Sequence, residues 1–394
     1  MRTGLDRILD DAELRQKLLA GRVGLLAHPA SVSRLLGHSS RALRAAGVRL
    51  ELIFGPEHGY GGEAQDMIGV GDARDTDGTP VRSLYGARFD DLSPKRADLS
   101  SIDVLVIDLQ DVGARYYTFV WTAVLAMRAC ARANVRVVVL DRPNPLGGVA
   151  LEGRVLSPEF RSFVGLEPAP IRHAMTLGEI CAWRREQERL DVELTIVRCE
   201  WDRRALAFDW EDRWVLPSPN MPTPTTALVY PGGCLLEGTN LSDGRGTTRP
   251  FELTGAPFVD GLRLSQALAS LELPGCVARP VTFSPTFHKH GKALCGGVQI
   301  HVTDRNAFRP VLTYVALIAL AHHQSPSDFR FRTEPYEFVD DIPAFDLLTG
   351  DAEARLRITA GDDPMEIATA ASRLREGEDE LLALSVDLGM RAGR

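Results

Sequence analysis

The sequence lacks any apolar run long enough to form a transmembrane helix. Its longest apolar stretch, residues 311–321, is too short to span a bilayer and instead fits a buried helix. The opening residues, Met1–Asp6, contain no apolar core of the kind that signal peptides have. We therefore expect a cytoplasmic protein that does not associate with a membrane.

Clusters of positive charge and metal-binding spacings are also scarce. The formal net charge is −8 at pH 7, and no block of lysine and arginine offsets it, which argues against sequence-independent binding to nucleic acid. The six cysteines are scattered and none forms a CxxC pair, so we expect free thiols and no zinc site. We predict no metal ion and no other cofactor.

Three common site motifs are missing. No GxGxxG follows the first expected strand and no GxxxxGK[ST] occurs, which argues against a dinucleotide or a P-loop nucleotide. No GxSxG elbow is present, which disfavours covalent serine chemistry. These absences leave carboxylate chemistry as the simplest use of the polar loops described below.

The pattern of apolar runs predicts an α/β fold in the first half of the 394-residue chain. Strands and helices alternate there, as they do in a parallel sheet with crossover helices. We predict strands at 22–27, 50–54, 103–108, 136–140 and 192–199, and helices at 8–19, 34–46, 119–133 and 176–190. The predicted architecture is a Rossmann-like, mostly parallel sheet with flanking helices.

The second half of the chain has a different pattern. The proline-rich segment 217–224 breaks all periodicity and marks a domain boundary. Beyond it we predict helices at 260–271, at 308–323 and from Asp363 onward, and strands at 277–283 and 296–303. We therefore predict a Rossmann-like domain over 1–222 and a smaller α+β domain over 223–394, with an active-site cleft between them.

One loop after an expected strand has the features of a site. The segment Phe54–Gly62 turns abruptly from an apolar strand into glycine, proline and the ionisable Glu57 and His58. Ligands of open α/β sheets bind where the strands end, so the polar exit loops should meet there. These loops contain His28, Glu57, Gln110-Asp111 and Asp141-Arg142. The alternative for the first loop is a tight turn whose Glu57 and His58 are merely solvated.

A second loop, 237–248, surrounds one arginine with small polar residues. Arg245 is suited to bidentate contact with the carboxylate of a ligand. The alternative is that Arg245 pairs locally with Asp243 or Glu237. Long loops in compact domains are often functional, so we favour the ligand site.

Other segments hold further candidates. Arg115 lies beside Tyr116, and aromatic faces suit a sugar ring but also fill protein cores. His288 and His290 are two residues apart, and we expect a solvated or substrate-facing loop rather than a metal site, since no third ligand is obvious. Asp108 is either a structural cap of its loop or a catalytic group.

Many segments, in one order along the chain, are similar to a single family. They are Gly24–Ser31, Phe54–Gly59, Ser83–Gly86, Asp108–Thr118, Leu140–Pro145, Pro217–Pro222, Glu237–Thr248, Pro285–His290 and Cys295–Gln299. Through them the chain resembles the exo-β-N-acetylmuramidase NamZ family over nearly its whole length. The resemblance implies a glycosidase that removes N-acetylmuramic acid from the non-reducing ends of peptidoglycan fragments in cell-wall turnover. It also implies a Rossmann-like domain and a smaller domain with the site in the cleft between them.

The resemblance makes Glu57 the leading catalytic residue. We expect it to act as general acid, with His58 tuning it or binding the substrate, and Asp111 or Glu237 as base or nucleophile unless the 2-acetamido group of the substrate assists. The expected substrate-binding residues are His28, Gln110, Arg115, Tyr116, Asn220, Asn240, Arg245, His288 and His290. Arg245 or Arg115 is expected to face the lactyl carboxylate. His28 departs from the family, which often has asparagine there.

Two other function classes fit the same residues. One is a metal-dependent hydrolase that uses His58, Asp108 and Asp111. The other is a non-catalytic protein that binds amino sugars. The expected partners are peptidoglycan-derived saccharides such as MurNAc-GlcNAc fragments, and the chain is expected to be a monomer or a homodimer.

Overall fold

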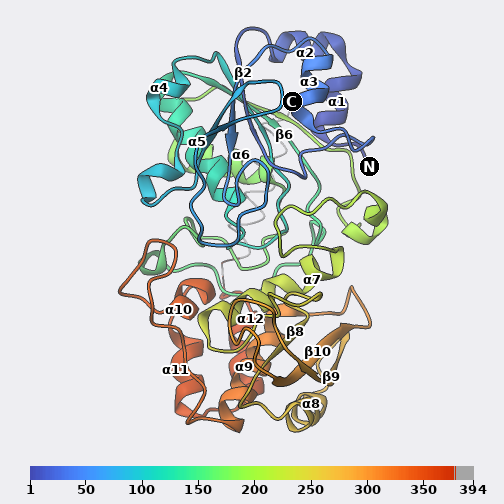
Figure 1. The fold of residues 1–394 in the computed structure, drawn as a ribbon, viewed down its shortest axis with the longest axis vertical. Coiled ribbons are helices and arrows are strands. Elements are labelled where there is room, and N and C mark those ends of the chain that lie inside the picture. The colour runs from blue at the N-terminus through green and yellow to red at the C-terminus, as the bar shows by residue number, and fades with distance from the viewer. Residues whose placement is uncertain (377, 379–394) are drawn as a thin grey trace.

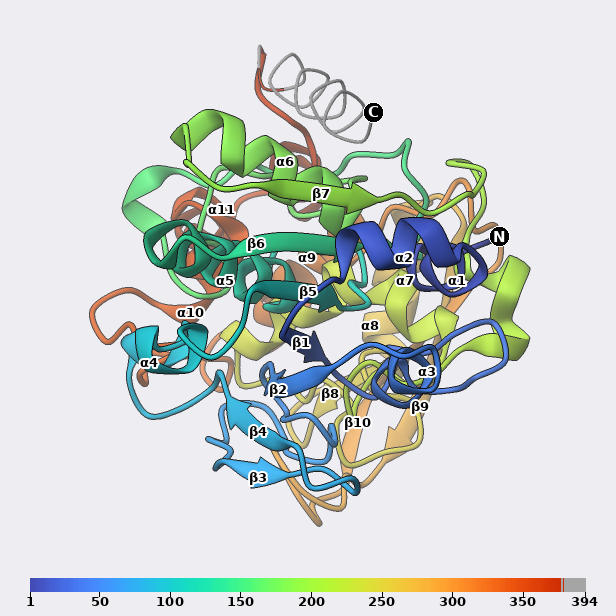
Figure 2. The ribbon, with the colours of Figure 1, turned by 90° about the horizontal axis from the view of Figure 1, so that it is seen from above.

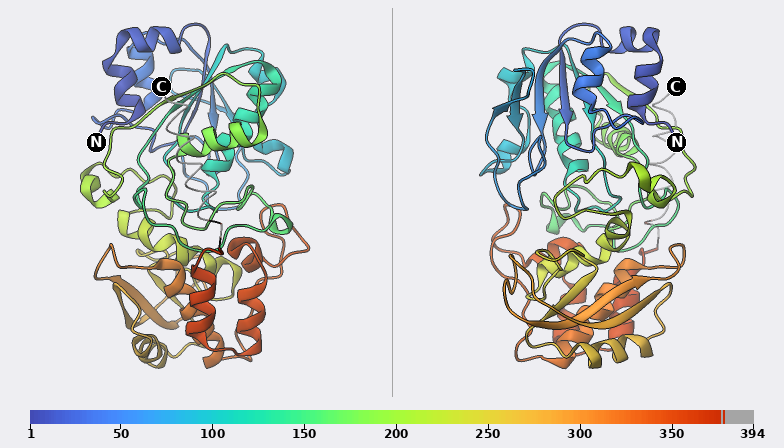
Figure 3. Two further views of the ribbon diagram at one scale, coloured as in Figure 1. Left: turned by 180° about the vertical axis from the view of Figure 1, so that it is seen from behind. Right: turned by 45° about the vertical axis from the view of Figure 1, so that its right-hand side comes forward.

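A computed structural model describes residues 1–376 and 378 of the chain. Figure 1 shows two parts stacked along the long axis of the molecule. The upper one, here called the large-sheet part, contains a seven-stranded sheet, and the lower one, the small-sheet part, contains a three-stranded sheet. Figure 3 shows the same division from two further sides, with a layer of loops between the parts.

The large sheet has the strand order β3-β4-β2-β1-β5-β6-β7. All pairings are parallel except the one between β3 and β4, which is antiparallel. The strands are β1 (Val23–Ala27), β2 (Leu50–Gly55), β3 (Ala73–Arg74), β4 (Pro80–Ser83), β5 (Val104–Asp108), β6 (Arg136–Leu140) and β7 (Leu194–Val197). This topology confirms the predicted Rossmann-like α/β fold.

Helices cover both faces of the large sheet. Figure 2 shows α1, α2 and α3 on one side of the strands and α4 and α5 on the other. The helices and short 3-10 turns of this part are α1 (Gly4–Asp10), α2 (Ala12–Leu18), α3 (Ser39–Ala45), η1 (Phe89–Leu92), α4 (Arg96–Leu99), α5 (Phe119–Ala133), η2 (Pro158–Phe160), α6 (Leu177–Glu188) and η3 (Ala207–Arg213).

Alternate residues of each strand pack on opposite faces of the sheet. In β1, Leu25 belongs to the core under α1 and α3, and Leu26 belongs to the core under α5. Both side chains are fully buried. A strand that is buried on both faces needs an unbroken apolar run, and this is why the runs in the sequence predicted the sheet.

The small-sheet part packs an antiparallel sheet, ordered β8-β10-β9, against helices. Helix α9 lies against α7, α8 and α12, and most of its residues are buried. The elements are α7 (Pro224–Gly233), η4 (Cys234–Gly238), β8 (Leu253–Ala256), α8 (Gly261–Ser270), β9 (Cys276–Phe283), β10 (Cys295–Val302), α9 (Pro310–Gln324), α10 (Ala344–Thr349), α11 (Glu353–Ala360) and α12 (Pro364–Ser372). In the described chain no helix is both long and apolar enough to cross a membrane.

Two predicted helices have different bounds in the structure. The helix expected at 8–19 is divided because Asp11 has an extended backbone and its carboxylate accepts a hydrogen bond from the Leu14 amide, which starts α2. The helix expected from residue 34 begins at Ser39, with His38 as its N-cap. Strands β3, β4 and β8 are short and were not predicted.

Candidate active site

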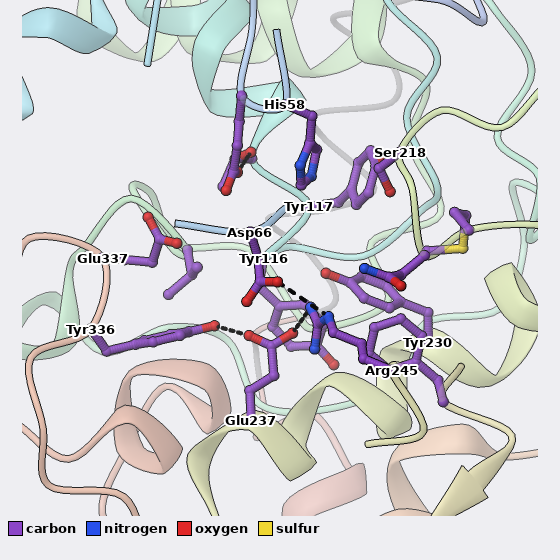
Figure 4. A pocket seen from close by; sticks show the side chains of 16 residues that line it. His58, Asp66, Tyr116, Tyr117, Ser218, Tyr230, Glu237, Arg245, Tyr336 and Glu337 are labelled. Atoms are coloured by element: carbon purple, nitrogen blue, oxygen red, sulfur yellow. Dashed lines mark hydrogen bonds and ion pairs between the residues drawn. The ribbon is translucent and has the colours of Figure 1, made fainter. Parts of the chain in front are cut away.

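A pocket between the two parts gathers charged and aromatic side chains from distant segments (Figure 4). About 490 Å³ of space, part of it open to solvent, lies between these side chains. Its polar lining consists of Glu57, His58, Asp66, Thr118, Ser218, Asn220, Glu237, Arg245 and Glu337. Its aromatic lining consists of Tyr116, Tyr117, Tyr230, Phe251 and Tyr336. The pocket therefore brings together the two loops that the sequence singled out, around Glu57 and around Arg245.

Strand β2 delivers Glu57 to the pocket. The strand ends at Gly55, where a Cβ atom would lie 2.5 Å from the backbone nitrogen of Tyr60, so the tight turn requires glycine. Glu57 is buried, and it accepts a hydrogen bond of 2.6 Å from the hydroxyl of Thr118, the N-cap of α5. This hydrogen bond fixes the Glu57 carboxyl group at the start of α5.

His58 points into the same pocket from a left-handed backbone conformation (φ +68°) (Figure 4). Its Nδ1 lies 2.8 Å from the carbonyl oxygen of Ala64. Because a carbonyl only accepts, Nδ1 is the donor in this contact, and Nε2 is the ring nitrogen left to contact a ligand. His58 is therefore placed to contact a ligand hydroxyl or amide beside Glu57.

Arg245 lies at the centre of a buried ion network on the opposite wall. Its guanidinium is 2.6 Å from Glu237, 3.0 Å from Asp243 and 3.4 Å from Asp66. Although burial opposes it, these carboxylates raise the pKa of Arg245 well above its ordinary value. Glu237 also accepts a hydrogen bond of 2.6 Å from the hydroxyl of Tyr336. The local pairing with Asp243 and Glu237, which the sequence left open as an alternative, is the arrangement that the structure has.

Glu337 is a third buried carboxyl group in the pocket, and sequence reasoning missed it. Both of its oxygens accept from the Tyr85 hydroxyl, at 3.1 and 3.3 Å. Burial, together with the negative charge of Glu57, raises the pKa of Glu337 well above its ordinary value. Burial and the same two carboxylates also raise the pKa of Tyr85. The only signal in the sequence was an acidic residue beside Tyr336 in an irregular segment.

An aromatic wall faces these groups. The ring of Tyr230 packs edge-to-face against Phe251 at 4.9 Å, Tyr116 at 5.6 Å and Tyr117 at 5.8 Å between ring centres. Such a cluster presents flat apolar surface next to polar groups. The pocket can therefore hold a ring with one apolar face and several hydroxyl groups.

Comparison with known proteins identifies the family. A model described as "Exo-beta-N-acetylmuramidase NamZ, N-terminal" matches residues 23–225, and its C-terminal counterpart matches residues 228–377. The chain belongs to the exo-β-N-acetylmuramidase NamZ family. The peptidoglycan β-N-acetylmuramidase NamZ of Bacillus subtilis (strain 168) is 42% identical over 365 residues, which cover 92% of this chain and 85% of that protein.

Solved structures share the fold. A crystal structure of a DUF1343 family protein from Bacteroides fragilis NCTC 9343 has a TM-score of 0.84 and 30% sequence identity, covering 98% of both chains. A second DUF1343 family protein from the same organism has a TM-score of 0.73 at 24% identity, covering 100% of this chain and 98% of the other. The second likeness concerns the fold alone.

Several residues in the NamZ motifs lie away from the pocket. Asp111 is buried beside His173, with 3.1 Å between its carboxylate and the imidazole Nε2, and it accepts from the backbone amide of Gly113. Arg115 is fully buried and donates to three carbonyl oxygens, and burial lowers its pKa to about 10. Neither residue lines the pocket. Both satisfy the backbone of the loops around them.

His28 and Gln110 hold the sheet edge together. The Nε2 atom of His28 accepts from the Gln110 amide at 2.9 Å, and its Nδ1 lies 3.2 Å from the Pro217 carbonyl. Burial lowers the pKa of His28 to about 3, so the ring is neutral. An asparagine, which the family resemblance suggested at this position, also offers both a donor and an acceptor.

Some of the remaining predicted residues line the pocket, and the others make contacts outside it. Asn220 lines the pocket and donates to Gln65 at 2.8 Å, while Tyr116 lines it with its ring and donates its hydroxyl to a main-chain carbonyl. Asn240 donates to a backbone carbonyl, and His290 lies 2.6 Å from the Asn240 carbonyl. His288 stands behind the ion network, 3.9 Å from Asp66.

The three residues of the metal alternative do not meet. Asp108 is fully buried and forms a two-bond ion pair with Arg142, at 2.7 and 3.0 Å, so it is a structural group. His58 is held by a carbonyl and Asp111 faces His173, as described above. In the described part of the chain, no group of three or more His, Cys, Asp or Glu side chains is arranged to hold a metal ion.

Proposed function

We propose that this protein is an exo-acting glycoside hydrolase that releases N-acetylmuramic acid from the non-reducing ends of peptidoglycan fragments in cell-wall turnover. Membership in the NamZ family supports the proposal, as does the 42% identical relative named a peptidoglycan β-N-acetylmuramidase. One observation carries it furthest. The buried carboxyl groups of Glu57 and Glu337 share one pocket with a wall of aromatic rings.

This pair of groups fits the chemistry of glycoside hydrolysis. The reaction needs a carboxylic acid that protonates the leaving oxygen and a carboxylate that stabilises or attacks the anomeric carbon. The bond from the anomeric carbon to the leaving oxygen breaks, its electron pair stays on that oxygen, and the oxygen takes the proton. Water then adds to the anomeric carbon and returns a proton to the pair. Substrate assistance by the 2-acetamido group would leave the carboxylate to orient that group.

Glu237 and Asp111, the two expected partners of Glu57, are less suited to this part. The charge of Glu237 is matched by Arg245, and its second oxygen accepts from Tyr336. Asp111 is outside the pocket. We therefore propose that Glu237 holds Arg245 and Tyr336 in place in the pocket and does not transfer a proton.

The lactyl carboxylate of muramic acid needs a cation at the rim. Arg245 is already paired with Glu237 and Asp243, and Arg115 donates to backbone carbonyl oxygens and does not line the pocket. Arg332 stacks on the ring of Tyr336, with its guanidinium carbon 5.0 Å from the ring centre. In the described residues its guanidinium contacts the Pro335 carbonyl and the Met67 sulfur, and no carboxylate pairs with it. We assign the lactyl carboxylate to Arg332.

Hydrolysis of p-nitrophenyl N-acetylmuramide, with the glucosaminide as control, tests the proposal. We expect turnover of the muramide and little or none of the glucosaminide. Binding of muramic derivatives without release of nitrophenol would favour the amino-sugar-binding alternative instead. The cytoplasmic location and the monomeric or homodimeric state stay predictions from the sequence.

A further inference from the structure

The segment that carries Glu337 is held in an unusual conformation. Glu337 and Phe338 both have left-handed backbone angles, with φ of +47° and +68°. Each such residue costs of the order of 1–3 kcal/mol, so the surrounding contacts must fix the turn. Two backbone hydrogen bonds between Tyr336 and Val339 close the turn, at 2.8 and 3.0 Å. The Phe338 ring adds contacts with Tyr85, Phe89 and Phe163, at centre distances of 6.0 to 6.3 Å. A strained turn from the small-sheet part thus places Glu337 against the large-sheet part.

The two carboxyl groups of the pocket have opposite surroundings. Glu57 accepts a short hydrogen bond from the Thr118 hydroxyl at the start of α5. Glu337 accepts only from the phenol of Tyr85 in the described structure, with neither a cation nor a backbone amide as partner. A buried carboxyl group without a charged donor is stable when it keeps its proton.

Three carboxylates face Glu337, and the negative charge of each raises its pKa. They are Glu57, Glu237 and Asp66, whereas the Tyr85 hydroxyl, which donates to Glu337, acts in the opposite direction. Like charges that share a site cannot all be ionised cheaply, so one proton is retained. Arg245 does not offset this, because it is already shared by three carboxylates.

We propose that Glu337 is the proton donor of the reaction and that Glu57 acts beside it as the ionised carboxylate. The inference rests on the glycosidase function proposed above and reverses the role that the sequence suggested for Glu57. The carboxyl proton of Glu337 passes to the leaving oxygen as the glycosidic bond breaks. The proton that the attacking water loses goes to a carboxylate of the pair. The Tyr85 hydroxyl, which faces both groups, can return it to Glu337.

The test compares two substrates that differ in their need for a proton donor. The disaccharide MurNAc-GlcNAc has an alkoxide leaving group that must be protonated, whereas p-nitrophenyl N-acetylmuramide releases a stable phenolate. For Glu337→Gln we expect kcat/KM on the disaccharide to fall about 10²- to 10⁴-fold, the usual contribution of a general acid. On the aryl substrate we expect less than about a tenfold loss. Glu57→Gln should lose both activities.

Controls separate this inference from the function itself. The exposed Glu334, three residues earlier, gives the matched variant Glu334→Gln, which should behave as wild type. Wild-type enzyme that cleaves neither substrate would overturn the proposed function. Wild-type enzyme that cleaves both, with a Glu337→Gln variant that keeps the disaccharide activity, would overturn only this inference. The inference would also be overturned if Glu337→Gln lost activity equally on the disaccharide and the aryl substrate while Glu57→Gln kept its activity on the aryl substrate.

A pH profile gives a second readout that a merely structural role would not move. With the disaccharide, the wild-type rate should fall on the alkaline side as the proton donor ionises, and that limb should vanish in the residual activity of Glu337→Gln. If Glu337→Gln melts well below wild type, Glu337→Met replaces it, because it also removes the acidic proton, and it should show the same split between substrates. An unchanged alkaline limb would contradict the assignment.

Discussion

Arg245 should be the residue on which the stability of the pocket depends most. Its side chain is 6% exposed, and it holds Glu237 and Asp243, whose side chains are 7% and 1% exposed. Removal of one partner of a buried ion pair costs about 3–5 kcal/mol, because the other charge stays buried and unpaired. For Arg245→Met we therefore expect a loss of about 3–5 kcal/mol in the free energy of unfolding, a large part of the total of a typical domain.

Two features of the network adjust this magnitude. In the variant, Lys289, which lies 3.5 Å from Asp243, still partly balances the charge of that carboxylate, and Tyr336 still donates to Glu237. These contacts favour the lower end of the range. Arg245→Lys keeps the charge, but an ammonium group cannot replace the planar guanidinium donors that contact three carboxylates. We therefore expect it to lower the free energy of unfolding by about 1–3 kcal/mol.

Urea unfolding followed by tryptophan fluorescence measures this loss. The control is Arg49→Met, since Arg49 pairs with Glu51 but is 72% exposed, and a surface pair contributes about 0–1 kcal/mol. Adding Glu237→Gln to Arg245→Met should recover part of the stability, because it removes one stranded charge. An Arg245→Met variant that loses no more than Arg49→Met would refute the reasoning.

Three further predictions follow from the same structure. Burial lowers the pKa of His28 from 6.5 to about 3, so between these two pH values the unfolded chain binds more protons than the folded one, and stability rises with pH. In urea titrations at several pH values, His28→Asn should reduce the slope of the unfolding free energy against pH by up to about 1.4 kcal/mol per pH unit. Arg332→Gln should raise KM for the muramide roughly tenfold with kcat little changed, whereas Arg330→Gln, on an exposed neighbour, should not. Exhaustive chelation should leave hydrolysis intact; loss that added metal restores would revive the metal-dependent alternative.

The sheet was predictable because its physics is local. Strand β6 and helix α5 have the predicted bounds, since one is an unbroken apolar run and the other ends where the left-handed Asn134 follows a long apolar helix. The helix predicted from residue 176 is also present, and Thr176 and Glu179 form a capping box at its start. The short strands β4 and β8 were missed because their stability comes from neighbouring strands and not from their own pattern.

The site was predictable only in part. Glu57 and Glu237 were found because glycine-rich loops follow apolar or helical segments. Glu337 was not, because its position depends on a strained turn and on contacts with Tyr85 across the two parts of the chain. Arg115 was expected at the site, but a loop packed into the interior uses it to satisfy buried carbonyl groups. Sequence pattern identifies which loops are polar, and long-range packing decides which side chains reach the pocket.

The most direct test of the central claim is the release of free N-acetylmuramic acid from MurNAc-GlcNAc. Wild-type protein should release it, and Glu57→Gln, with the thermal stability of wild type, should not. Release at a near-normal rate by Glu57→Gln, or no release by folded wild-type protein, would contradict the account.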